Sequence, residues 1–207
     1  GYPRRALRLH SCAVAIATEH DGVVPNSYDE LVALPGIGDY TASAVVSFAF
    51  GGRATVLDTN VRRLIARAES GIANCPTSVT RAERVVADAL VPDEDVRAAK
   101  WAVASMELGA LVCTARSPQC EVCPIRDGCR WVIDGRPDNA PARRGQPWKG
   151  TDRQCRGVIM DVVRNSPRGV KVQMALSAWP EPDQASRCLE SLLDDGLVHR
   201  RGSLISL

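Results

Sequence analysis

Four cysteines close together constrain the fold and chemistry of this chain more than any other feature. Cys113, Cys120, Cys123 and Cys129 follow a C-x6-C-x2-C-x5-C spacing in a segment rich in turn residues. Four thiolates in one short loop system form the soft, anionic ligand set that a tetrahedral metal or an iron–sulfur cluster requires. Zinc sites usually have two C-x2-C pairs separated by a longer stretch. A single C-x2-C pair flanked by lone cysteines favours a [4Fe–4S] cluster, with zinc as the alternative.

The other cysteines bear on the compartment. Cys12, Cys75, Cys155 and Cys188 are scattered singly, and we expect them to be buried as small apolar side chains. Ligand cysteines beside unpaired ones indicate a reducing, intracellular compartment, which predicts a cytoplasmic protein, associated with the nucleoid in a bacterium. The sequence has no run of about 18 apolar residues, so it predicts no membrane span. The net charge of +2 is too small to indicate a nucleic-acid partner by itself.

Helical periodicity and capping signals dominate the chain up to residue 133. A capping box at Ser27–Glu30 opens a short helix, and Thr80 with Glu83 opens another that extends to Leu90. Further helices are predicted over 4–20, 41–50, 61–68 and 95–112. Strand signals are nearly absent. Residues 1–133 are therefore predicted to form an all-α domain that includes the cysteine loop at 113–129.

The remainder of the chain has a different pattern. Residues 134–153 are dense in Pro, Gly and Arg and are predicted to be a linker. Helices are expected over 154–165, 171–179 and 183–195, followed by β-type runs over 197–200 and 203–207. Three helices and a hairpin predict a small α+β, winged-helix-like domain over 154–207. Arg187, Arg200 and Arg201 are its candidate DNA contacts, although a packing or partner module fits equally well.

Two glycines mark the turn between the second and third expected helices, in Leu34-Pro35-Gly36-Ile37-Gly38-Asp39-Tyr40-Thr41. Glycines there allow a positive φ and a close backbone approach. The N–H groups at the start of the following helix then favour an anion such as a DNA phosphate. A plain turn between two helices is the alternative.

Three motifs together resemble a known family. LPGIGDYTA (34–42), VLDTNVRR (56–63) and the cysteine quartet look like the helix-hairpin-helix DNA glycosylases with an iron–sulfur cluster, and most resemble the A/G-specific adenine DNA glycosylases. The resemblance covers residues 1–131. It implies two helical lobes, a [4Fe–4S] cluster, a monomer, and double-stranded DNA with a mismatched or oxidised base pair in the cleft. The implied DNA contacts are Leu34, Gly36, Ile37, Gly38, Tyr40 and Thr41, with Arg116 and Arg126 from the cysteine loop.

Asp58 corresponds to the catalytic aspartate of that superfamily. Cleavage of an N-glycosidic bond builds positive charge on the sugar, which a carboxylate stabilises. The alternative role is a helix N-cap, but Thr59 or Asn60 can also cap, so Asp58 is not needed for it. Tyr40 stands where strand-cutting relatives similar to endonuclease III have a Schiff-base lysine. A phenol cannot form an imine, so the resemblance implies a monofunctional enzyme that uses water.

The chain departs from the family in two places. The family's general acid, a glutamate in a motif like E-V-M-L-Q-Q-T-Q, has no counterpart here, and Glu19 and Glu30 are poor substitutes. We therefore expect an N-terminally truncated glycosylase with little or no activity alone. Residues 154–207 are also too few for the nucleoside-diphosphate-hydrolase-like domain of many relatives.

Two further interpretations of the function remain open. A thymine-specific mismatch glycosylase shares the tyrosine, and a non-catalytic iron–sulfur protein that binds DNA or senses redox state would keep the cluster. Arg62, Arg63 and Arg67 are additional candidates for phosphate contacts.

Overall fold

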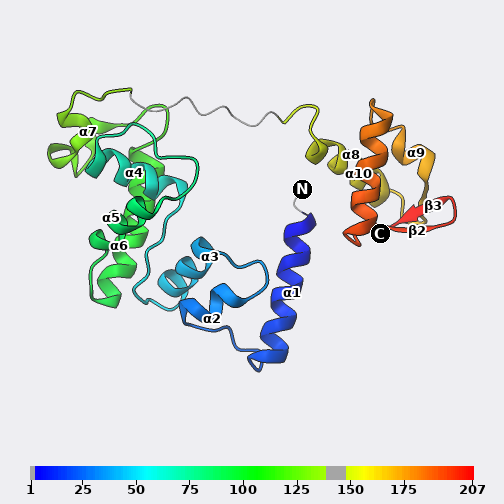
Figure 1. Cartoon of the computed structure of the whole chain (residues 1–207), viewed down its shortest axis with the longest axis horizontal. Coiled ribbons are helices and arrows are strands. Elements are labelled where there is room, and N and C mark those ends of the chain that lie inside the picture. The colour runs from blue at the N-terminus through cyan, green and yellow to red at the C-terminus, as the bar shows by residue number, and fades with distance from the viewer. Residues whose placement is uncertain (1–2, 139–147) are drawn as a thin grey trace. The chain divides into compact units, whose positions relative to one another are not determined.

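The computed structural model describes residues 3–138 and 148–207, which form two compact units. Contacts divide the chain into a larger unit, Arg8–Arg143, and a smaller unit, Arg144–Leu207 with Gly1–Leu7. Figure 1 shows the order of the elements from α1 to β3. Part of the predicted linker, residues 139–147, lies outside the described residues. The domain limits 1–133 and 154–207 remain predictions.

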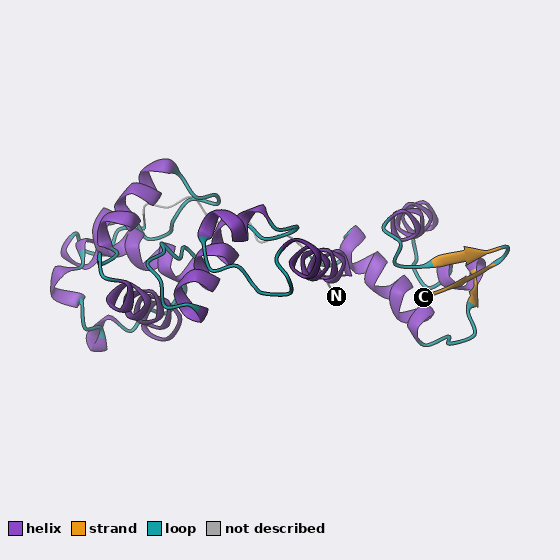
Figure 2. Cartoon of the chain, turned by 90° about the horizontal axis from the view of Figure 1, so that it is seen from below, coloured by secondary structure: helices purple, strands orange, loops and turns teal. Residues whose placement is uncertain are grey.

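The regular elements in the described part of the larger unit are all helices, as predicted. Its helices are α1 (Pro3–Glu19, which begins in the smaller unit), α2 (Tyr28–Ala33), α3 (Asp39–Ala44), α4 (Thr59–Ser70), α5 (Arg81–Leu90), α6 (Asp95–Glu107) and α7 (Arg130–Ile133). Two π-helical segments, Val45–Ala49 and Leu108–Val112, prolong α3 and α6. Short 3-10 turns at Cys120–Val122 and Arg126–Gly128 shape the cysteine loop. Figure 2 shows this unit without strands.

Capping fixes two helix starts as the sequence predicts. The Ser27 hydroxyl accepts a hydrogen bond from the Glu30 N–H at the start of α2. Thr80 and Glu83 form a reciprocal capping box at the start of α5. Each cap satisfies N–H groups that the first turn of a helix leaves without partners.

The larger unit has more than one hydrophobic core, in keeping with the predicted two-lobed fold. One core joins α1, α2 and α3 through Cys12, Ala15, Leu31, Leu34, Ala42 and Val46. A second joins α4 and α5 through Leu57, Val61, Ile65 and Ala87. A third, with Ala73, Cys129 and Trp131, packs α7 on the cysteine loop.

The smaller unit is the predicted α+β fold, with one strand more than predicted. Its elements are α8 (Asp152–Arg164), β1 (Val170–Lys171), α9 (Val172–Leu176), α10 (Pro182–Asp194), β2 (His199–Arg201) and β3 (Leu204–Ser206). The antiparallel sheet has the order β1-β3-β2. The predicted helix 171–179 is too long, because Val170 and Lys171 pair with Ile205 and Leu204 before α9 begins. The buried side chains of α8, α10 and the sheet form one core that includes Cys155 and Cys188.

Two compositional predictions can be compared with the structure. The four scattered cysteines, Cys12, Cys75, Cys155 and Cys188, are all buried, as expected. In the part of the chain that the structure describes, every helix is too short or too polar to cross a membrane.

Candidate DNA-binding hairpin, carboxylate and metal centre

The glycine turn joins α2 to α3 in a tight hairpin. Gly36 has φ +76°, and a Cβ added there would lie 2.7 Å from the Cβ of Arg8 on α1. Gly36 therefore meets both a conformational and a steric requirement. Gly38 is the N-cap of α3, without a side-chain cap, and an added Cβ there would meet no atom within 4 Å. The first N–H groups of α3 thus lack a capping side chain, as a phosphate site requires.

The predicted contact residues of the hairpin differ in exposure. Tyr40 is exposed, and Ile37 and Thr41 are half-buried. The Leu34 side chain is only 5% exposed and packs in the α1–α3 core. Only the backbone of Leu34 is left for contact with DNA, and Leu34 as a DNA contact stays a prediction.

An ion pair ties the hairpin to α5. Asp39, the first residue of α3, accepts a hydrogen bond of 2.7 Å from the Tyr28 hydroxyl and one of 2.5 Å from Arg84 Nη2. The Asp39 hydrogen bond, helped by burial, raises the pKa of Tyr28 above its usual value. Arg84 offsets the negative charge of Asp39 beside the candidate phosphate site. Arg84 was not among the residues predicted from the sequence, because its partner Asp39 is 45 residues away.

Asp58 is the N-cap of α4. Its Oδ1 accepts a hydrogen bond of 2.7 Å from the Val61 N–H, and its Oδ2 accepts one of 2.9 Å from Asn60 Nδ2. The alternative role considered for Asp58, a helix N-cap, is the one that the structure shows, and neither Thr59 nor Asn60 takes its place. Capping is compatible with catalysis, because each carboxylate oxygen can accept a second hydrogen bond. The cap fixes the orientation of the carboxylate, which is half-buried.

Hydrogen bonds connect Asp58 to the start of the cysteine loop. Asn60 Oδ1 accepts a hydrogen bond of 2.9 Å from Arg63 Nη2, and Arg63 Nε donates one of 2.7 Å to the Cys113 carbonyl. Arg63 also donates to the Gly109 carbonyl. A Cβ on Gly109 would lie 2.6 Å from the Asn60 carbonyl, so glycine permits this close packing. Burial lowers the pKa of Arg63.

The prediction that the α4 arginines contact phosphates is wrong. Arg62, Arg63 and Arg67 are 7%, 6% and 3% exposed. Arg62 makes a bidentate ion pair with Glu83, at 2.6 and 2.9 Å, and donates to the carbonyls of Pro76 and Ser78. The Glu83 hydrogen bond raises the pKa of Arg62. These guanidinium groups stabilise loops within the unit and do not reach its surface.

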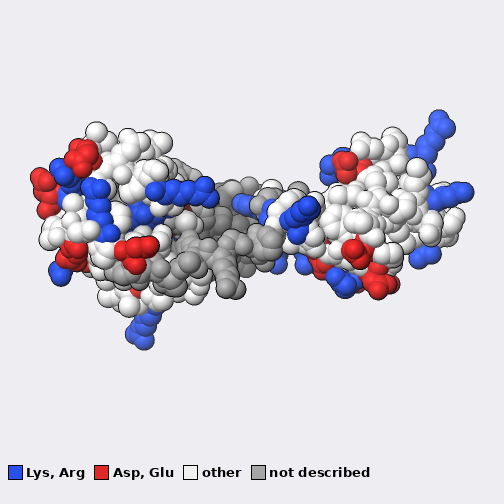
Figure 3. All heavy atoms as spheres, turned by 90° about the horizontal axis from the view of Figure 1, so that it is seen from above, with Lys and Arg blue, Asp and Glu red and all other residues white. Residues whose placement is uncertain are grey.

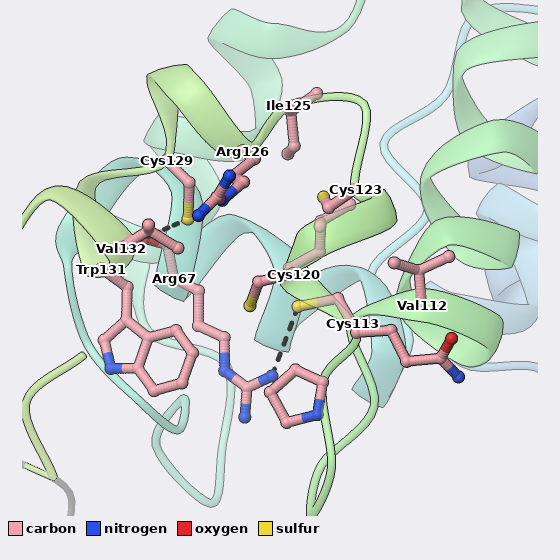
Figure 4. A pocket seen from close by; sticks show the side chains of 13 residues that line it. Arg67, Val112, Cys113, Cys120, Cys123, Ile125, Arg126, Cys129, Trp131 and Val132 are labelled. Carbon is pink, nitrogen blue, oxygen red and sulfur yellow. Dashed lines mark hydrogen bonds between the residues drawn. The ribbon is translucent and has the colours of Figure 1, made fainter. Parts of the chain in front are cut away.

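Arg67 holds the beginning of the cysteine loop. Its guanidinium donates to the carbonyls of Ala73, Thr114 and Ala115, at 2.9, 2.8 and 3.3 Å. It also donates to Cys113 Sγ at 3.3 Å and lies 4.7 Å from the ring centroid of Trp131. Figure 4 shows this guanidinium between the Trp131 ring and the Cys113 sulfur. A buried cation thus stands directly beside one of the four thiols.

The four predicted ligand cysteines line a single hollow of about 340 Å³, counting space open to solvent. In Figure 4 their sulfur atoms surround a common space. Cys129 is buried, the other three are half-buried, and all four are free thiols. Burial raises the pKa of Cys123, and the other three cysteines raise it further. That mutual effect is expected of thiols that share one site.

The hollow carries the ligands that an iron–sulfur cluster requires. A four-iron cluster is wider than an ion, so its four thiolate ligands surround a larger space. The donor set is all sulfur, and Leu64, Ile125 and Trp131 supply an apolar wall. Chemically, the cysteines fit an iron–sulfur cluster.

The two loop arginines predicted to contact DNA are both exposed. Arg126 lies 3.1 Å from the exposed carboxylate of Glu121, and Arg116 is at the surface nearby in sequence. Exposed ion pairs are weak, so Arg126 can exchange Glu121 for a phosphate at little cost.

Comparison with known proteins agrees with these features. The chain matches a helix-hairpin-helix motif over residues 19–48 and the iron–sulfur binding domain of endonuclease III over residues 113–129. It is 51% identical to an adenine DNA glycosylase of Mycolicibacterium smegmatis, over 97% of this chain and 67% of the relative. The chain belongs to the adenine DNA glycosylase family. An adenine DNA glycosylase of Mycobacterium tuberculosis is 48% identical, over 97% of this chain and 66% of the relative.

Solved structures place this adenine DNA glycosylase family member in the same fold as other DNA glycosylases. A thermostable thymine-DNA glycosylase matches with a TM-score of 0.54 and 28% identity, covering 63% of this chain and 59% of that one. Endonuclease III in a non-covalent DNA complex matches with a TM-score of 0.52 and 29% identity, over 63% and 58%. The predicted helix-hairpin-helix fold and [4Fe–4S] binding loop are confirmed. The chain spans about two thirds of the length of the curated relatives.

Proposed function

We propose that this chain acts in base excision repair as a monofunctional DNA glycosylase that removes adenine paired with 8-oxoguanine or guanine. The observation that carries the proposal is Asp58, a carboxylate fixed by hydrogen bonds at 2.7 and 2.9 Å in a chain 51% identical to an adenine DNA glycosylase. Duplex DNA is the partner, as in the endonuclease III complex that the fold matches. The monomeric state and the cytoplasmic location stay predictions.

In this mechanism the N–H groups at the start of α3 bind a backbone phosphate, and the target nucleotide leaves the base stack. Asp58 then faces the sugar, where its charge stabilises the oxocarbenium ion as the N-glycosidic bond breaks. Water completes the hydrolysis, because the Tyr40 phenol cannot form a Schiff base. Cys113, Cys120, Cys123 and Cys129 would hold the [4Fe–4S] cluster, which when bound cross-links the loop that carries Arg116 and Arg126.

Departure of neutral adenine also requires a general acid. Glu30 does not suit this role, because it accepts a hydrogen bond of 2.5 Å from Ser27 at the start of α2. Little or no activity of the chain alone is still a prediction. The test of Asp58 should not depend on the acid.

Binding of a duplex with a cationic pyrrolidine nucleotide opposite 8-oxoguanine tests Asp58 without the general acid. This nucleotide resembles the oxocarbenium ion but has no base that must leave. We expect Asp58→Asn to weaken binding of this duplex about 10- to 100-fold, the equivalent of about 1.5–3 kcal/mol for a charged hydrogen bond. Asparagine caps helices as well as aspartate, so α4 remains capped. An uncharged tetrahydrofuran nucleotide in the same duplex is the matched control. Equal loss with both probes would refute direct charge stabilisation by Asp58.

The opposite-base preference separates this proposal from a thymine-specific enzyme, which the match to a thymine-DNA glycosylase structure makes the second candidate. Binding is compared for duplexes with the pyrrolidine nucleotide opposite 8-oxoguanine, guanine, cytosine and thymine. A preference for 8-oxoguanine over guanine and the pyrimidines supports adenine as the target, whereas a preference for guanine over 8-oxoguanine would favour the thymine-specific enzyme. When the chain is incubated with a duplex that carries an abasic site, borohydride should trap no covalent protein–DNA adduct, because Tyr40 cannot form the Schiff base that borohydride reduces.

A further inference from the structure

The three-stranded sheet of the smaller unit has one inner and one outer face. Ile205 and Val170 point into the core, at 0% and 6% exposed. Residues that pair directly in antiparallel strands share a face. Lys171 pairs with Leu204, which pairs with Arg201, so these three side chains lie together on the outer face. His199, which pairs with Ser206, is on that face as well.

The sheet and its flanking turns carry positive charge without acidic neighbours in sequence. Residues 164–180 and 196–207 contain no Asp or Glu, and their basic residues are Arg164, Arg168, Lys171, Arg200 and Arg201. All five are exposed. Within the described residues, none of them forms a salt bridge. Their charge is therefore available to an external partner.

Helix α10 has the opposite character. In a helix-turn-helix domain the second helix of the motif usually enters the major groove. Here the exposed side of α10 carries Asp183, Glu190 and Asp194. Its one arginine, Arg187, lies 2.9 Å from Asp152. Figure 3 shows acidic side chains gathered along one edge of this unit, and separate Lys and Arg side chains at its end. Such a helix repels phosphates.

We propose that the smaller unit binds the phosphate backbone of duplex DNA through the outer face of its sheet, centred on Lys171 and Arg201, and not through α10. Neighbouring strands are about 4.8 Å apart, so Lys171 and Arg201, on the two outer strands, present charges roughly 10 Å apart. Both side chains are long and flexible enough to reach phosphates of one backbone. Contacts of this kind position the unit on DNA without reading sequence. The choice of DNA as the polyanion rests on the proposed function.

The salt dependence of binding tests this surface. Fluorescence anisotropy of the full chain with an undamaged labelled duplex gives the slope of log K against log salt. Each phosphate contact contributes about 0.9 to that slope. We expect the double variant Lys171→Gln/Arg201→Gln to have a slope that is less steep by about 1.8. Between about 50 and 200 mM salt, the loss of affinity of the double variant should then be about 12-fold smaller than that of the unaltered chain. Arg201→Gln and the matched control Arg187→Gln each remove one arginine charge from the same unit. Only the former should change the slope.

Four outcomes decide the matter, with circular dichroism to verify that each variant is folded. An unchanged slope in the double variant overturns the proposal, as does an equal effect of Arg187→Gln, which would assign the contact to α10. If the double variant keeps the slope for DNA but loses binding to anionic lipid vesicles, the partner of this face is a membrane surface, and the proposal is overturned as well. Slope changes in a chain that shows no preference for mispaired duplexes would support this surface while contradicting the proposed function.

Discussion

Replacement of Arg67 by methionine tests how much the cysteine loop depends on one buried guanidinium. Arg67 is 3% exposed and donates to the carbonyls of Ala73, Thr114 and Ala115. Methionine fills similar volume but leaves these acceptors without their donor. Hydrogen bonds to a charged group contribute about 1.5–3 kcal/mol each, and they are not additive. Since water can reach part of the loop, we expect a total loss of about 3–5 kcal/mol.

Thermal unfolding of the cluster-loaded chain measures this loss, with circular dichroism for the helices and absorbance at about 400 nm for the cluster. At about 2–4 °C per kcal/mol, the expected decrease in Tm is about 6–20 °C. The same substitution at Arg97, which is exposed on α6, is the control and should change stability by less than about 0.5 kcal/mol. Arg67→Lys should give an intermediate loss, because one ammonium cannot reproduce the planar fork. A Tm for Arg67→Met equal to that of the Arg97 control would refute the structural role of Arg67.

Two further predictions concern the hairpin and the smaller unit. Gly36→Ala should lower the free energy of unfolding by about 1–2 kcal/mol and weaken duplex binding, because φ is +76° and Arg8 blocks the new Cβ. Gly157→Ala, inside α8 with open space around the new Cβ and no positive φ, should not lower stability in the same urea titration; equal losses would contradict the steric reasoning. In the smaller unit, hydrogen bonds from Gln184 and Arg187 hold the pKa of Asp152 below its ordinary value of 3.8. The resulting stability is present above about pH 4 and is lost as pH falls through the lower folded-state pKa. Asp152→Asn should therefore reduce the acid sensitivity of unfolding, and an unchanged pH profile would show that the pairing contributes nothing.

The sequence predicted the features that depend on local signals. Capping at Ser27 and Thr80, the glycine turn and the cysteine spacing each involve residues close in the chain, and each occurs in the structure. Strand β1 was missed because only two residues define it, and their partners Ile205 and Leu204 are remote in sequence.

The burial of the three α4 arginines could not be predicted from the sequence for a similar reason. The apolar stripe of α4 predicts one buried face, yet Arg62, Arg63 and Arg67 on its other sides are also buried. Most of their acceptors are backbone carbonyls, several of them far along the chain, such as Cys113 for Arg63, 50 residues away. A carbonyl acceptor leaves no mark in side-chain composition. The spacing of Asn60 and Arg63, three residues apart on a helix, was the one local signal for the hydrogen bond between them.

Helix α4 connects the candidate catalytic carboxylate to the metal centre. Its N-terminus holds Asp58, and one turn later Arg63 binds both Asn60 and the Cys113 carbonyl. A further turn along, Arg67 binds the next two carbonyls and the Cys113 sulfur. A loop that loses its cluster would therefore disturb two arginines whose hydrogen bonds are anchored on the same helix as Asp58. The candidate catalytic carboxylate and the loop that would hold the cluster are thus anchored on one helix, through Asn60, Arg63 and Arg67.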